Sequence, residues 1–173
     1  MKQKFHIIDA FVGNNASGNG CAVVMDVDLS DSRRLHNIAQ EFNQPATAFL
    51  HQIQDNQYRI RWFAPESEID LCGHGAMAST WLLTQHLNQY DKVIFEYGNN
   101  QSLTGYKKTN GAVSIKGERI QPTRAELPEH VIKGFHGKAV AYYTSENKHI
   151  VVFENEDEVR SLSPDWDALR LSN

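Results

Sequence analysis

The sequence has few cysteines, no paired metal-ligand motif and no basic run. Its two cysteines, Cys21 and Cys72, form no CxxC pair, so we expect neither a disulfide framework nor a zinc site. Eight histidines occur without HExxH or paired spacing, which gives no indication of a metal. Both cysteines are therefore expected to be reduced thiols.

Charge and apolar runs exclude further classes. Seventeen basic and 21 acidic residues give a net charge of −4 without a Lys/Arg cluster, so we expect no nucleic acid or membrane surface as partner. His6 and Asp9 interrupt the apolar N-terminal stretch, and no later run could span a bilayer. We expect a cytoplasmic protein with a small-molecule ligand.

The 173 residues, 40% of them hydrophobic, can form a buried core. Helical spacing of apolar residues predicts an amphipathic helix at 30–43, and an Ala- and Leu-rich segment predicts a buried helix at 75–87 with its first turn at 73–76. β-branched and aromatic content predicts strands at 4–12, 21–26, 47–52, 57–65, 90–98, 102–109, 112–117, 139–144 and 149–154.

These elements predict an α+β fold in which an antiparallel sheet packs with a central helix. Composition changes at Pro122, where a charged segment without a strand partner begins. We therefore expect a lobe over 1–118 and part of a second lobe over 119–173. The last segments, 157–162 and 164–171, are expected to be short helices.

The stretch "DLCGHGAMAS" (70–79) places Cys72 and His74 where the central helix begins. Glycines let backbone N–H groups at a helix start approach a ligand, and the helix dipole favours an anion such as a carboxylate. A thiol in such a position has a lowered pKa, and an imidazole there stays neutral and can accept a proton. Both side chains are candidate proton carriers.

Simpler interpretations stand beside these. Cys72 can be a small buried hydrophobe, and His74 a side chain bonded to the backbone. "SGNG" (17–20) is also typical of a plain hairpin turn, and Glu66, Glu68 and Asp70 are typical of a solvated acidic turn. A cysteine hydrolase is disfavoured, because no Asn or Asp is placed by sequence to orient the imidazole.

Read together, the motifs resemble those of the PhzF-like (phenazine biosynthesis) family. They are "DAF", "SGNG" and "AVV" near the start, "IAQEFN" and "TAF" in the middle, and the specific block "IRWFAPESEIDLCGHGAMAS". The likeness extends to "VRSLSPDWDAL" near the end.

The resemblance implies a diaminopimelate epimerase-like fold of two similar α+β lobes, each a curved, mostly antiparallel sheet around a central helix, with the active site between them. It implies cofactor-free isomerisation of a small carboxylic acid by proton transfer at carbon, with His74, and by analogy to the epimerases Cys72, as catalytic residues. The substrate would lie against the glycine-rich loops, which here contain Gly18, Asn19, Asp70, Gly73, Gly75 and Ala76.

Two departures bear on activity. The family commonly has a glutamate in "N-x-S-E-T-A-F", whereas this chain has Ala46 at that position, so the usual general base is replaced by a methyl group. Relatives also continue through the rest of the second lobe. Strands 139–144 and 149–154 would then have unpaired edges and an uncovered apolar face, which predicts a homo-oligomer or a complementary second-lobe chain. The alternative to an isomerase is a non-catalytic ligand-binding or assembly module.

Overall fold

The computed structural model describes residues 4–13, 18–145 and 148–170. The chain divides into two compact units, Met1–Glu118 and Arg119–Asn173, here called the first and second unit. Among the described residues, no helix is long and apolar enough to cross a membrane.

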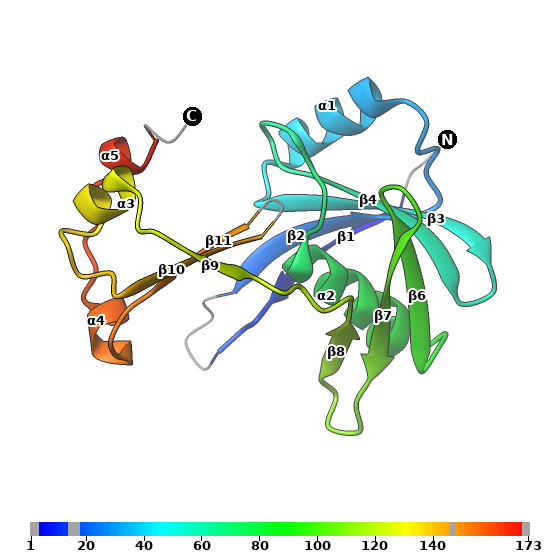
Figure 1. The fold of residues 1–173 in the computed structure, drawn as a ribbon. Coiled ribbons are helices and arrows are strands. Elements are labelled where there is room, and N and C mark those ends of the chain that lie inside the picture. The colour runs from blue at the N-terminus through cyan, green and yellow to red at the C-terminus, as the bar shows by residue number, and fades with distance from the viewer. Residues whose placement is uncertain (1–3, 14–17, 146–147, 171–173) are drawn as a thin grey trace. The chain divides into compact units, whose positions relative to one another are not determined.

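The first unit is built on one sheet whose strands lie in the order β1-β2-β3-β4-β6-β7-β8, with β5 paired to β4 (Figure 1). The strands are β1 (Phe5–Ala10), β2 (Asn19–Val24), β3 (Ala46–Gln54), β4 (Gln57–Phe63), β5 (Glu68–Ile69), β6 (Lys92–Tyr97), β7 (Gln101–Lys107) and β8 (Val113–Lys116). Most neighbours are antiparallel, as expected, but β2 and β3 are parallel, as are β4 and β6.

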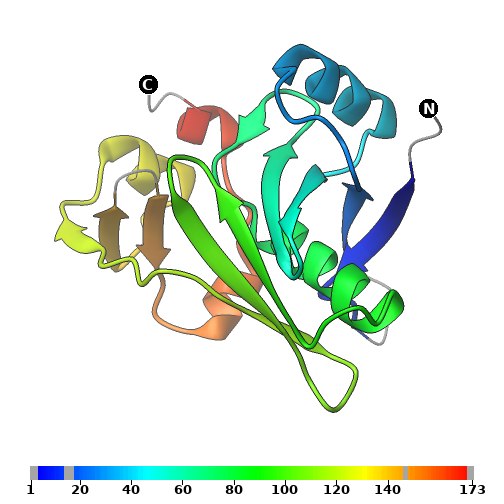
Figure 2. The same cartoon turned by 90° about the vertical axis from the view of Figure 1, so that its right-hand side faces the viewer.

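Both parallel pairs are joined through a helix, because two parallel strands need a long crossover connection. The helix α1 (Ser32–Phe42) connects β2 to β3 and packs on β3 and β4. The helix α2 (Gly73–Trp81) precedes β6 and contacts β1, β2, β3, β7 and β8. The sheet therefore curls around α2 and carries α1 on its outer face (Figures 1 and 2).

Local sequence explains where these helices begin. Asp31 caps α1 by accepting a hydrogen bond from the backbone N–H of Arg34 at 3.0 Å, and Asn43 ends the helix in the left-handed region at φ 48°. The first turn of α2 begins at Gly73, as predicted. Its α-helical geometry ends earlier than predicted, at Trp81, and a π-helix over Leu82–His86 continues it.

Apolar alternation decides which side of the sheet each strand residue faces. Tyr58, Ile60 and Trp62 share one face of β4, as expected, and pack in the large apolar cluster around α2. Phe49 and Phe63 point the other way, into a smaller cluster beneath α1. The start of α2 is thus held by the main core of the first unit.

The second unit holds a three-stranded sheet in the order β11-β10-β9, formed by β9 (Thr123–Ala125), β10 (Ala141–Ser145) and β11 (Lys148–Val152). Its helices are α3 (Glu129–Gly134), α4 (Glu156–Arg160) and α5 (Trp166–Arg170). The sequence did not predict β9 or α3. The charged segment after Pro122 does have a strand partner, because Ala125 pairs with Tyr142.

Candidate functional site at the start of helix α2

Cys72 is the N-cap of α2. Its backbone is extended (φ −117°, ψ 102°), and its sulfur accepts a hydrogen bond from the N–H of Gly75 at 3.4 Å. The side chain is buried, with 4% of its surface exposed. A thiol therefore takes the capping place that Ser, Thr or Asp usually fills, so its sulfur lies beside the first-turn N–H groups of the helix.

His74 lies directly against this thiol. Cys72 Sγ and His74 Nδ1 are 3.3 Å apart, which places the two predicted proton carriers in hydrogen-bond contact. The imidazole is only partly buried. One short loop therefore supplies a thiol and an imidazole that can exchange a proton with each other and with a bound molecule.

The strand β2 contributes a third component through Gly20, which pairs with Asp9 of β1. Burial lowers the pKa of His74 below its ordinary value of 6.5, and a hydrogen bond to the backbone of Gly20 opposes this effect in part. The lowered pKa favours the neutral imidazole at neutral pH, and its cause is burial rather than the helix-start position on which the sequence-based expectation rested. A side chain on residue 20 would meet the end of the Gln44 side chain, which would have to move.

Trp62 of β4 forms the wall behind the helix start. A Cβ on Gly75 would lie 2.7 Å from Trp62 Cδ1 and 2.9 Å from Nε1, so this close approach requires glycine. The indole Nε1 is buried and has no hydrogen-bond partner among the described residues. An unpaired buried donor next to the helix start is costly in free energy.

Ala46, which the resemblance aligned with a family glutamate, begins β3 and pairs with Cys21 of β2. Both residues are fully buried, and both belong to the apolar cluster that contains Cys72, Trp62 and Ala76. Burial, with a smaller effect from the neighbouring Cys72 thiol, raises the pKa of Cys21 to about 12. Residue 46 thus lies within apolar packing.

The other predicted binding residues do not all lie at the start of α2. Gly73 and the buried Gly75 and Ala76 lie in the first turn of α2, whereas Asp70 is exposed just before it. Asn19 begins β2, next to Gly20. Gly18 is exposed and lies against Asp9, since a Cβ added to Gly18 would be 2.6 Å from the Cβ of Asp9. The rest of that loop, 14–17, lies outside the described residues.

Two residues at the site were missed from sequence. The backbone of Gly20 bonds to His74 and Trp62 lies against Gly75, but each was interpreted only as part of a turn or a strand. The glycine at residue 20, inside a predicted loop motif, was the sequence signal that could have indicated a close backbone approach here. Nothing local indicates that Trp62 would face Gly75 from another element.

Among the described residues, no group of three or more His, Cys, Asp or Glu side chains could hold a metal ion. The groups that the structure places at the start of α2 are helix-start amides, one thiol and one imidazole. This combination can bind an anion and move protons.

The architecture is the diaminopimelate epimerase-like α+β fold. It matches a solved PhzF-family structure from Enterococcus faecalis with TM-score 0.81 and 27% identity, over 100% of this chain and 65% of that one. A predicted epimerase from Pseudomonas aeruginosa shares the fold, with TM-score 0.73 and 16% identity, over 98% of this chain and 66% of that one.

The chain belongs to the phenazine biosynthesis-like (PhzC-PhzF) family, whose sequence model matches residues 8–172. An uncharacterized isomerase of Pseudomonas aeruginosa is 29% identical over 163 residues, which cover 94% of this chain and 62% of the relative. This chain therefore spans less than two thirds of the length of such relatives.

Proposed function

We propose that the first unit is the proton-transfer lobe of a PhzF-type isomerase acting on a small carboxylic acid. The observation that carries this proposal is the 3.3 Å contact between Cys72 Sγ and His74 Nδ1 at the N-terminus of α2. Relatives whose names describe them as isomerases support the reaction class.

The helix start supplies the anion-binding part of the reaction. N–H groups in the first turn of a helix have no intrahelical acceptor, and Gly73 leaves this turn open because it is exposed and carries no side chain. A substrate carboxylate bound there would place its neighbouring carbon near His74. The same amides would stabilise the enolate that forms when that carbon loses a proton.

The imidazole and the thiol supply the proton carriers. Because burial keeps His74 neutral, its ring can accept a proton from the substrate carbon, and Cys72 can donate to or accept from the ring. No carboxylate at residue 46 assists them. One positioned acid or base is worth about 10²- to 10⁴-fold in rate, so we expect slow turnover.

A specific observation favours a second function, a non-catalytic binding module. Ala46 is not merely a missing carboxylate, since it is fully buried in an apolar cluster with Cys21. In this alternative the helix start still binds a carboxylate, but no proton leaves the ligand.

Two measurements separate these functions. Acetate and benzoate are titrated while the His74 resonances are followed by NMR, and deuterium incorporation from D₂O is measured for small acids with an acidic C–H beside the carboxylate. We expect carboxylate binding and weak exchange that His74→Ala removes. Ala46→Glu alone is not expected to restore fast exchange.

Each outcome has a clear meaning. Binding without any exchange that depends on His74 would favour the binding module. Absence of carboxylate binding would contradict both functions. Fast exchange by the wild-type chain, abolished by His74→Ala, would show that the imidazole suffices without a carboxylate at residue 46.

A further inference from the structure

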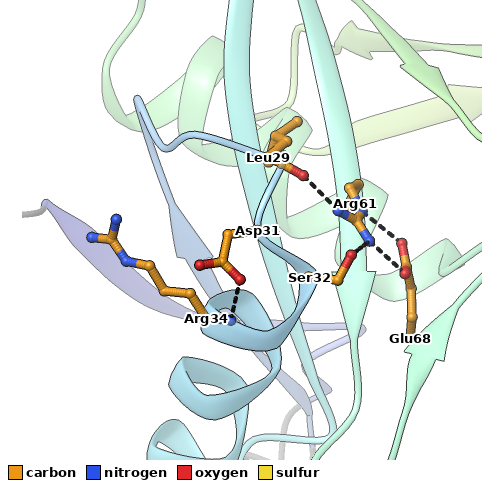
Figure 3. Close-up of polar contacts among 6 residues, drawn as sticks. All are labelled: Leu29, Asp31, Ser32, Arg34, Arg61 and Glu68. Carbon is orange, nitrogen blue, oxygen red and sulfur yellow. Dashed lines mark hydrogen bonds and ion pairs between the residues drawn. The ribbon is translucent and has the colours of Figure 1, made fainter.

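Arg61 lies on the outer face of the sheet and contacts two separate segments, the stretch that leads into α1 and the one around Glu68 (Figure 3). Its Nε and Nη2 donate to the two carboxylate oxygens of Glu68 at 2.7 and 2.6 Å. Its Nη1 donates to the carbonyl of Leu29 at 2.5 Å, and Nη2 also donates to Ser32 Oγ at 2.8 Å. The guanidinium also lies over the Phe63 ring at 5.1 Å.

Glu68 belongs to the segment that leads into the site. The sequence suggested a solvated acidic turn here, but Glu68 begins β5 and pairs with Phe63. Only one further pair, Ile69 with Trp62, ties β5 to the sheet. Cys72 follows four residues after Glu68, so this two-residue strand is the last regular structure before the helix cap.

The arrangement explains how the segment is held in register. The side chain of Glu68 is fixed on the outer face, whereas Ile69 and Leu71 pack against the inner apolar cluster. A second link acts in the same place, because His36 Nε2 of α1 bonds to the carbonyl of Pro65 at 2.9 Å. The outer helix is therefore connected twice to the segment that carries the site.

We propose that Arg61 and Glu68 are positioning residues for the site at the start of α2. Their bidentate ion pair, here called the clamp, holds β5 against β4 and thereby sets the contact between Cys72 and His74. The functional meaning of this clamp rests on the proposed role of those two residues. Its structural effect does not require any substrate.

The chemistry of the clamp makes it sensitive to conservative change. Arginine offers a planar fork that matches a carboxylate and still has donors for Leu29 and Ser32, whereas lysine provides a single charged nitrogen. The side chains are only 22% (Arg61) and 42% (Glu68) exposed, so water replaces these bonds incompletely. Loss of the fork should increase local opening of the segment.

The same strand provides a matched control. Arg59 lies two residues away, donates to the carbonyl of Gly98 at 3.2 Å and approaches Glu96 at 4.0 Å without a bidentate pair. Arg59→Lys and Glu96→Gln therefore repeat the two chemical changes outside the clamp.

The experiment measures alkylation of Cys72 in Arg61→Lys and Glu68→Gln, with the fully buried Cys21 of the same chain as internal reference. Local opening of the loop should raise the Cys72 rate about tenfold while Cys21 stays unchanged. In the same variants, NMR titration should show the pKa of His74 rising toward 6.5, since its burial is reduced. The two control variants should change neither value.

Other results overturn the proposal. Unchanged Cys72 rates in both variants would show that the clamp does not position the site. A parallel increase for Cys21 and Cys72 would show general destabilisation only. If Arg61→Lys does not fold, Glu68→Gln decides. Because alkylation needs no turnover, the clamp and the isomerase function can fail independently.

Discussion

The two units of this chain bury their apolar residues very differently. The first unit encloses Ile60, Trp62 and Leu82 in one cluster around α2. Among the described residues of the second unit, the buried apolar side chains are Val131 and Tyr142, whereas Ile120, Ile132, Val140, Ile150, Val159 and Trp166 are exposed. A unit with so little buried apolar surface is hard to stabilise alone. The site at α2 therefore rests on the larger core of the first unit, and we expect the exposed apolar side chains of the second unit to be covered by a partner.

The largest expected effect is a difference in stability between two isoleucine variants, one in each unit. Ile60 is 1% exposed and Ile150 is 43% exposed. Ile60→Ala removes atoms from a packed core and should lower the free energy of unfolding by about 2–5 kcal/mol, whereas Ile150→Ala should cost less than about 1 kcal/mol. Urea unfolding followed by fluorescence measures both. Equal losses would contradict the difference between the units.

The second prediction concerns the exposed face of the second unit. We expect an oligomer at micromolar concentration, with an apolar interface that covers part of 122–173. Ile150→Lys should weaken assembly, while Ile53→Lys, on a first-unit residue that is 46% exposed, should not. Light scattering tests this, and a stable wild-type monomer would show the expectation to be wrong.

A smaller effect distinguishes the two thiols of the first unit. Cys21 is fully buried and its pKa is raised to about 12, mainly by burial, so little thiolate exists at neutral pH. Cys72 caps a helix, where the dipole favours the thiolate. Iodoacetamide should therefore modify Cys72 first, as mapped by mass spectrometry. Preferential labelling of Cys21 would contradict the anion-site interpretation.

The smallest effect is a pH dependence. Burial lowers the folded-state pKa of His74 below 6.5, so the unfolded chain binds more protons as pH falls through that value, and stability decreases on acidification. His6 acts in the same direction, chiefly through burial and then through His86 and Lys4.

Replacement by glutamine separates the contributions. Between about pH 7.5 and about pH 5.5, His74→Gln should lose less stability than the wild type. His51→Gln, on an exposed strand residue, should behave like the wild type. Urea midpoints at the two pH values measure the difference, and an unchanged slope in His74→Gln would show that this imidazole is not buried in its neutral form.

Local sequence patterns were sufficient to predict much of the secondary structure of the first unit. Apolar spacing predicts α1 to within two residues at its start and one at its end, and the CGHG motif correctly places the first turn of α2. The conversion of 82–86 to a π-helix was not predicted, because the α and π geometries bury similar side chains. β9 and α3 were missed because they are short and their apolar residues are sparse.

The sequence by itself determined most elements of the first unit, the helix-start position of Cys72 and His74, and the likeness to the PhzF-like family. Only the tertiary structure decided which distant residues meet there. Gly20 reaches His74 through the register of β2, and Arg61 reaches Glu68 because β5 folds back on β4. The physical reason is that the spacing of apolar residues indicates which helix or strand a residue belongs to and which face of it the side chain occupies. Contacts between different elements depend instead on strand order and register.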